Sequence, residues 1–204
     1  MLFNTPVFLF GFLPVTLVGF FLVARRNHAA AAGWLGLMSL VFYGWWSVAA
    51  LPLLLGSIGF NYVMGLLVTP APQLGDVARK RRLVFALAVN LLVLATFKYA
   101  DFFIVNANVA LGAAGIREVG LLGIVLPIGI SFYTFTQIAF IVDCYQGKVT
   151  ERRFIHYLLF VTYFPHLISG PVLHHAQMMP QFRKPETYRL NWPLFYTGLS
   201  IFGI

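Results

Sequence analysis

Residues 2–24 read LFNTPVFLFGFLPVTLVGFFLVA, a run without a charged side chain, and Arg25 and Arg26 follow it directly. A helix rises 1.5 Å per residue, so about 20 apolar residues cross the roughly 30 Å hydrocarbon core of a bilayer. A cleaved signal peptide would start with basic residues and have a shorter apolar core, and this run has neither property. We therefore predict a retained membrane helix. Pro6 and Pro14 would kink a helix in water, but in a membrane bundle neighbouring helices can satisfy the carbonyls that they free.

Further apolar runs follow, separated by polar or charged loops. They cover residues 29–46, 51–68, 83–105, 119–142 and 154–172, and a last apolar segment covers 193–204. Of the 204 residues, 60% are hydrophobic and only 10% are charged, which excludes a water-soluble globular protein. The sequence predicts an all-α fold, a polytopic transmembrane helical bundle. The last segment is too short to cross a bilayer, so we expect residues 1–204 to form a single membrane domain at the N-terminal end of a longer protein.

The chain is basic, with a formal net charge of +8. Its Lys and Arg residues lie in short clusters between the apolar runs, where the positive-inside rule for membrane proteins accounts for them. We therefore expect membrane lipid around the chain and no nucleic-acid partner. The single cysteine, Cys144, excludes an internal disulfide.

The fifth and sixth runs are interrupted within their length by proline and glycine. Pro127 and Gly129 interrupt the fifth run, and Pro165 and Gly170-Pro171 interrupt the sixth. Non-helical backbone at membrane depth is tolerated only where protein buries it or where it lines a water-filled cavity. The pattern predicts broken or re-entrant helices next to a cavity.

The distribution of basic residues predicts the orientation. With the N-terminus extracytoplasmic, the cytoplasmic loops hold Arg25, Arg26, the cluster 79–82, Lys148, Arg152 and Arg153. Only the last loop, with Arg183, Lys184 and Arg189, then violates the positive-inside rule. The violation disappears if residues 154–172 enter from the cytoplasm and return, so spanning and re-entrant arrangements both stay open.

Common catalytic signatures are missing from the sequence. Residues 129–133, GISFY, have Tyr133 where a nucleophile elbow needs a glycine. Adjacent His174 and His175 have no third ligand, so we predict no metal site.

Polar side chains on the broken runs are the remaining candidates for function, because polar groups at membrane depth usually face a bundle interior or an aqueous path. We expect them to line a cavity; they are Ser131, Gln137, Asp143, His166 and Ser169. Structural roles stay open for Ser131, which can bond its own helix, for Asp143 at the interface, and for His166, which can satisfy carbonyls freed by Pro165. Lys98 and Asp101, three residues apart, are expected to pair.

Several motifs recur in one order along the chain. They are FLFGFLP (8–14), SLVFYGWW (39–46), FNY (60–62), FKYADF (97–102), LPIGISFYTF (126–135) and FPHLISGPVL (164–173). Together they resemble the membrane-bound O-acyltransferase family, and within it the bacterial alginate O-acetylase branch. The resemblance extends from residue 3 to about residue 182. Phe140 departs from it, since a tyrosine is more usual there.

The resemblance implies a multi-pass enzyme of the bacterial inner membrane. Such an enzyme moves an acyl group, usually acetyl, from a cytoplasmic donor to hydroxyls of an extracytoplasmic polysaccharide such as alginate. The donor would be acetyl-CoA or a carrier-bound acyl group, with no bound cofactor, and polysaccharide-modification proteins outside the membrane would be partners. The family's essential histidine lies beyond this chain, so the catalytic residues are unknown and the chain alone is expected to be inactive. D-alanyl transfer to teichoic acid, or a transporter or channel with similar broken helices, remains an alternative.

Overall fold

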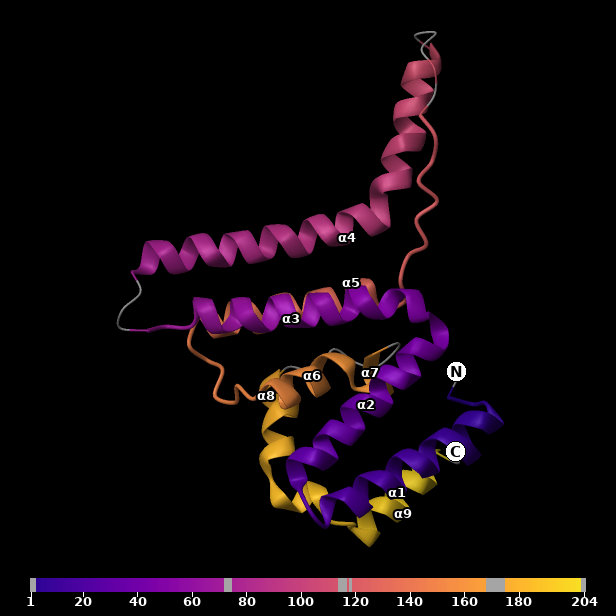
Figure 1. Ribbon diagram of the computed structural model, residues 1–204, viewed down its shortest axis with the longest axis vertical. Helices are drawn as coiled ribbons and strands as arrows, with labels where there is room; N and C mark the ends of the chain where they lie inside the picture. The colour runs from indigo at the N-terminus through magenta and orange to yellow at the C-terminus, as the bar shows by residue number, and fades with distance from the viewer. Residues whose placement is uncertain (1–2, 72–74, 114–116, 118, 168–174, 203–204) are drawn as a thin grey trace. The chain divides into compact units, whose positions relative to one another are not determined.

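The computed structural model describes residues 3–71, 75–113, 117, 119–167 and 175–202. The chain divides into two compact units, residues 1–48, 150–164 and 173–204 in the first and residues 49–149 and 165–172 in the second. The described residues form helices joined by turns and irregular segments, without a β-strand (Figure 1). This confirms the predicted all-α class, whereas the prediction of a single membrane domain stays a prediction.

Three helical segments are long and apolar enough to cross a membrane, and they are Val7–Ala24, Val48–Val68 and Asp76–Ala113. The chain is therefore a membrane protein. The first segment begins as a π-helical stretch, η1 (Val7–Phe12), and continues as α1 (Leu13–Ala24). The wide turns of η1 end two residues before Pro14. In a regular α-helix the ring of a proline clashes with the carbonyl group four residues earlier, which accounts for the wider turns before it.

The second unit is built from three helices, α3 (Leu51–Val68), α4 (Asp76–Ala113) and α5 (Ile130–Tyr145). Both α4 and α5 pack against α3, and α4 bends part of the way along its length (Figure 1). The prediction for α3 is confirmed to the residue. The helix α4 is longer than the predicted run at both ends.

The basic cluster 79–82 is helical, which corrects its predicted placement in a loop. The reason is Arg79, which lies buried in the first turns of α4. Its Nε donates to the carbonyl oxygen of Val68 at 3.0 Å, and Nη1 donates to Asp76 Oδ1 at 2.8 Å. Nη2 donates to the carbonyl oxygen of Tyr145, and the guanidinium lies over the Tyr145 ring. The cation thus satisfies carbonyls at the C-terminal ends of two helices, where helix dipoles favour positive charge.

The first part of the fifth run, residues 119–127, is not helical, although we predicted a run from 119. Side chains of α4 hold this segment: Asn108 exchanges hydrogen bonds of 2.8 Å with the backbone N–H and C=O of Val119. Asp101 accepts from the N–H groups of Leu122 and Ile124 at 2.9 and 3.2 Å. The expected pairing of Asp101 with Lys98 is therefore wrong, because the carboxylate satisfies irregular backbone instead. Lys98 Nζ lies 5.2 Å from the centre of the Tyr99 ring.

The first unit contains α1, α2 (His28–Trp46), α6 (Phe154–Thr162), α8 (His175–Met178), the 3₁₀ turns η3 (Met179–Arg183) and η4 (Pro185–Tyr188), and α9 (Trp192–Phe202). Asn27 caps α2, since its side chain accepts from the N–H groups of Ala29 and Ala30. The sixth run breaks at Tyr163, before α7 (Phe164–Leu167), so the predicted interruption is present.

The segment 175–188 runs back along α6. His156, in the first turn of α6, has its ring 6.2 Å from that of Phe182, whereas Phe160, one turn later, contacts His175 at 6.3 Å. Tyr188 then stacks on His28 with ring centres 4.4 Å apart and an interplanar angle of 4°. The loop that carries Lys184 and Arg189 thus lies at the same end of this unit as Arg25 and Arg26.

Candidate functional site

A buried cluster of amide and hydroxyl groups joins the three helices of the second unit. Asn61 on α3 and Asn90 on α4 bond each other reciprocally, with Nδ2 to Oδ1 distances of 3.0 and 2.6 Å. Asn61 Nδ2 also lies 2.6 Å from Gln137 Oε1 on α5, and Ser57 Oγ donates to the same oxygen at 3.3 Å. We call these four residues the amide cluster.

The spacing of the residues explains why the cluster forms. Ser57 and Asn61 are four residues apart, so they share one face of α3. Asn90 lies within an apolar stretch of α4, where its side chain also donates to the carbonyl oxygen of Ala86 at 2.8 Å. An amide in apolar surroundings is costly to leave unpaired, so each group takes a partner from a neighbouring helix. The cluster therefore fixes how these helices pack.

A cavity of about 250 Å³ adjoins the amide cluster. Its apolar wall and polar groups come from α3, α4 and α5, and the lining residues are Pro52, Leu53, Gly56, Ser57, Phe60, Asn61, Val89, Asn90, Val93 and Thr134. This volume exceeds that of several water molecules. None of these residues is ionisable, so the lining can orient water or a carbonyl group by hydrogen bonding but holds no general base.

The structure places the candidate residues from the sequence at separate points. Gln137 belongs to the amide cluster and is fully buried. Ser131 lies six residues before Gln137 and Asp143 lies six residues after it, each about 9 Å away along α5. Neither residue is therefore on the same helical turn as Gln137. Asp143 is buried near the C-terminal end of α5. Its backbone carbonyl oxygen accepts a hydrogen bond of 2.9 Å from the backbone N–H of Lys148.

His166 is buried beside Phe132, with ring centres 5.8 Å apart. Ser169 lies outside the described residues, as does the Gly170-Pro171 pair. The described candidates Ser131, Gln137, Asp143 and His166 are not among the lining residues of the cavity beside the amide cluster. Their cavity-lining role stays a prediction.

The two predicted helix breaks meet in the second unit. Gly129 precedes α5 with a positive φ of 74°, a conformation that glycine adopts without strain. A Cβ at this position would lie 3.1 Å from the carbonyl oxygen of Leu167. The two interrupted segments are thus in direct contact, through Gly129 and Leu167 and through Phe132 and His166.

Three members of the amide cluster were missed as site residues in the sequence. They are Ser57, Asn61 and Asn90, and the signal was present: polar side chains inside runs that are otherwise apolar. The i, i+4 spacing of Ser57 and Asn61 could have indicated one polar face. Among the residues that the structure describes, no three His, Cys, Asp or Glu side chains gather as metal ligands.

Comparison with known proteins shows two kinds of bacterial relative. The chain is 39% identical to the peptidoglycan O-acetyltransferase of Helicobacter pylori, over 100% of this chain and 43% of that protein. It is 41% identical to the probable alginate O-acetylase AlgI of Pseudomonas aeruginosa, over 89% of this chain and 34% of that protein. The corresponding protein of Pseudomonas syringae pv. tomato is 39% identical over 94% of this chain and 36% of its own length.

The chain thus spans less than half the length of each of these relatives. No family model matches it, and no solved structure matches it significantly. The relatives are nevertheless similar across nearly the whole chain, including the stretch that carries both helix breaks and the amide cluster. Over the length that it shares with them, the chain belongs to the membrane-bound O-acyltransferase family.

Proposed function

We propose that this chain is part of an enzyme that transfers acetyl groups to hydroxyls of an extracytoplasmic polysaccharide. The observation that carries the proposal is identity of 39–41% to proteins named as acetyltransferases, over 89% or more of the chain. The names of these relatives give two acceptors, alginate and peptidoglycan. Both present sugar hydroxyls, so the same chemistry serves either acceptor.

The proposed reaction moves an acetyl group across a bilayer. Acetyl-CoA or a carrier-bound acetyl group on the cytoplasmic side would be the donor, and free CoA or the free carrier would leave as the acetyl ester of the sugar hydroxyl forms. Polysaccharide-modification proteins outside the membrane would be partners in the transfer. The inner membrane is the location that separates these compartments. A polar path is needed for such transfer, and interrupted helices supply backbone groups to the wall of a path.

We assign positioning roles, not proton transfer, to the amide cluster. Asn61, Asn90 and Gln137 carry amides, which donate and accept hydrogen bonds but do not titrate. In the proposed enzyme the three amides hold α3, α4 and α5 together, and Asn61 and Asn90, which line the adjoining cavity, orient water or a carbonyl group there. The general base for the acceptor hydroxyl is not assigned to any of these residues.

We further propose that the sixth run is re-entrant and that the N-terminus is extracytoplasmic. Support comes from the return of the segment 175–188 along α6 and from the stacking of Tyr188 on His28. With this arrangement Arg25, Arg26, Lys184 and Arg189 share the cytoplasmic face, in agreement with the positive-inside rule.

Acetyl analysis of cell-surface polysaccharides tests the proposed activity. Peptidoglycan and secreted polysaccharide are isolated from cells with the gene, without it, and with the gene restored on a plasmid. The proposal expects ester-linked acetate to disappear from one of the two fractions on deletion and to return on complementation. Unchanged acetate in both fractions would contradict it and favour a transporter or channel.

A further inference from the structure

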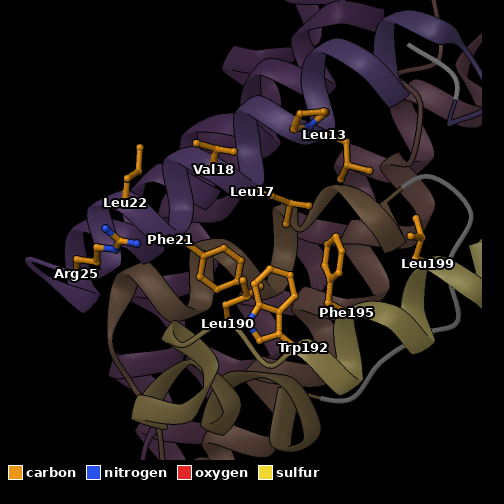
Figure 2. Close-up of a pocket in the computed structure, with 11 residues that line it drawn as sticks. Leu13, Leu17, Val18, Phe21, Leu22, Arg25, Leu190, Trp192, Phe195 and Leu199 are labelled. Carbon is orange, nitrogen blue, oxygen red and sulfur yellow. The ribbon is translucent and has the colours of Figure 1, made fainter.

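An open groove lies between α1 and α9 in the first unit (Figure 2). Its volume is about 500 Å³. The lining is aliphatic and aromatic except for one cation, and it consists of Leu13, Pro14, Leu17, Val18, Phe21, Leu22, Arg25, Leu190, Trp192, Phe195 and Leu199. Such a surface favours a hydrocarbon occupant over water.

The single cation lies at one end of the groove. Figure 2 shows Arg25 at the end of the α1 wall, with Leu13 and Leu199 toward the other end. Arg25 follows the last residue of α1 and is exposed. Among the residues that the structure describes, its guanidinium makes no hydrogen bond or ion pair. It is therefore available to an anion from outside the chain.

The dimensions of the groove match one leaflet of a bilayer. The 12 residues of α1 rise about 18 Å, close to half of a hydrocarbon core about 30 Å thick. The indole of Trp192 lines the opposite wall, and tryptophan prefers the headgroup boundary of a membrane. A cation at one end and an apolar groove about as long as one leaflet is thick complement the two parts of a phospholipid.

We propose that this groove binds an anionic phospholipid, with one acyl chain along the groove and the phosphate at Arg25. Arg189, which neighbours the lining residue Leu190 in the chain, adds a second positive charge. Basic pockets between membrane helices attract anionic lipid headgroups by this combination of charge and apolar surface. The site is separate from the proposed transfer reaction and does not depend on it.

The headgroup contact is tested with the purified full-length protein, using two neighbouring arginines. Retention of phosphatidylglycerol and of phosphatidylcholine with the same acyl chains is measured by native mass spectrometry for the wild type, Arg25→Gln and Arg26→Gln. We expect Arg25→Gln to weaken retention of phosphatidylglycerol about tenfold, the equivalent of one charge-assisted hydrogen bond, and Arg26→Gln to weaken it less than twofold. Equal losses in the two variants, or equal retention of both lipids by the wild type, would overturn the proposal.

The acyl-chain contact is tested by filling the groove. Leu17 lines it, whereas Val15, also on α1, does not and is 54% exposed. Leu17→Trp is expected to abolish phosphatidylglycerol retention, and Val15→Trp is expected to leave it within twofold of the wild type. Retention by Leu17→Trp at the wild-type level would show that the lipid lies elsewhere. A wild type that retains neither lipid would show that the groove does not bind phospholipid, and either result rejects the proposal.

Discussion

Gly129 lies so close to the carbonyl oxygen of Leu167 that a Cβ at this glycine would be 3.1 Å from that oxygen. Gly129 directly precedes α5, and Leu167 ends the short helix α7. The two residues belong to different interrupted segments, so their close approach joins the two breaks. A side chain at Gly129 would have to push them apart.

Replacement of Gly129 by alanine is expected to destabilise the protein. Alanine in the left-handed conformation costs about 1–2 kcal/mol, and the contact with Leu167 adds to this. Gly123 is a matched control, because it has a similar φ of 63° and open space around it. Thermal unfolding in detergent should show a larger drop in Tm for Gly129→Ala than for Gly123→Ala. Equal drops would mean that the contact with Leu167 does not contribute.

The amide cluster is expected to couple Asn61 and Asn90 energetically. Asn90→Leu removes both reciprocal hydrogen bonds and leaves Asn61 Oδ1 without its donor, Asn90 Nδ2. This loss should lower the free energy of unfolding by about 1–2 kcal/mol. The double variant Asn61→Leu/Asn90→Leu should lose less than the sum of the single variants.

The control for this cycle is Asn106→Leu, at an exposed amide on α4 that bonds the carbonyl oxygen of Phe102 within its own helix. We expect a change of at most about 0.5 kcal/mol there. Strict additivity of the Asn61 and Asn90 variants would contradict the cluster as described.

Arg79 is expected to be the most sensitive residue of the basic cluster. It satisfies carbonyls at the C-terminal ends of α3 and α5, and Arg79→Gln should destabilise the protein by about 2–3 kcal/mol, as expected for lost hydrogen bonds to a buried cation. Arg81→Gln, at an exposed position of the same cluster, should have little effect on Tm. Both variants remove one positive charge, but only Arg79→Gln also removes the hydrogen bonds to the carbonyls. Similar Tm values would therefore show that these hydrogen bonds do not contribute to stability.

The phenol of Tyr188 is expected to make the stability of the folded protein decrease at alkaline pH. Burial raises the pKa of its phenol above the usual 10.0, although the charge of Arg153 lowers it in part. The folded state therefore favours the neutral phenol, whose contribution is complete below pH 10 and is lost as the pH rises through the higher pKa of the folded protein. Tyr188 Oη also donates to the carbonyl oxygen of Phe182 at 2.7 Å.

Unfolding of the wild type and of Tyr188→Phe should be compared across that pH range. The variant lacks the hydrogen bond but has no phenol to ionise. We expect the stability advantage of the wild type to shrink above pH 10. An advantage that stays constant to higher pH would contradict the pKa shift.

The sequence predicted those helices that are bounded by local signals. Charged or turn residues bound the predicted apolar runs 29–46 and 51–68. The structure has α2 at His28–Trp46 and α3 at Leu51–Val68. Helix breaks at Gly129 and before Pro165 were also predicted, because proline and glycine act on their own stretch of backbone.

Features that depend on distant partners were not predicted. The start of α4 at Asp76 depends on carbonyls at Val68 and Tyr145 that Arg79 reaches only in the folded chain. The irregular segment after residue 119 is held by Asp101 and Asn108, which are far from it in sequence. The reciprocal pairing of Asn61 with Asn90 likewise forms only when two helices pack together. A polar residue in an apolar run indicates that some buried partner exists but does not identify that partner.

Cysteine accessibility tests most directly whether the sixth run enters the membrane and returns to the same face. In a Cys144→Ser background, single cysteines replace Arg26, Ser47 and Glu186, and a membrane-impermeant thiol reagent is applied to intact cells and to inverted membranes. Arg26 and Ser47 lie at opposite ends of α2, which the sequence predicts to cross the membrane, so they are expected to report on its two faces. We predict that the cysteine at 186 is labelled together with the cysteine at 26, in inverted membranes. Labelling of 186 together with 47, in intact cells, would contradict the re-entrant arrangement.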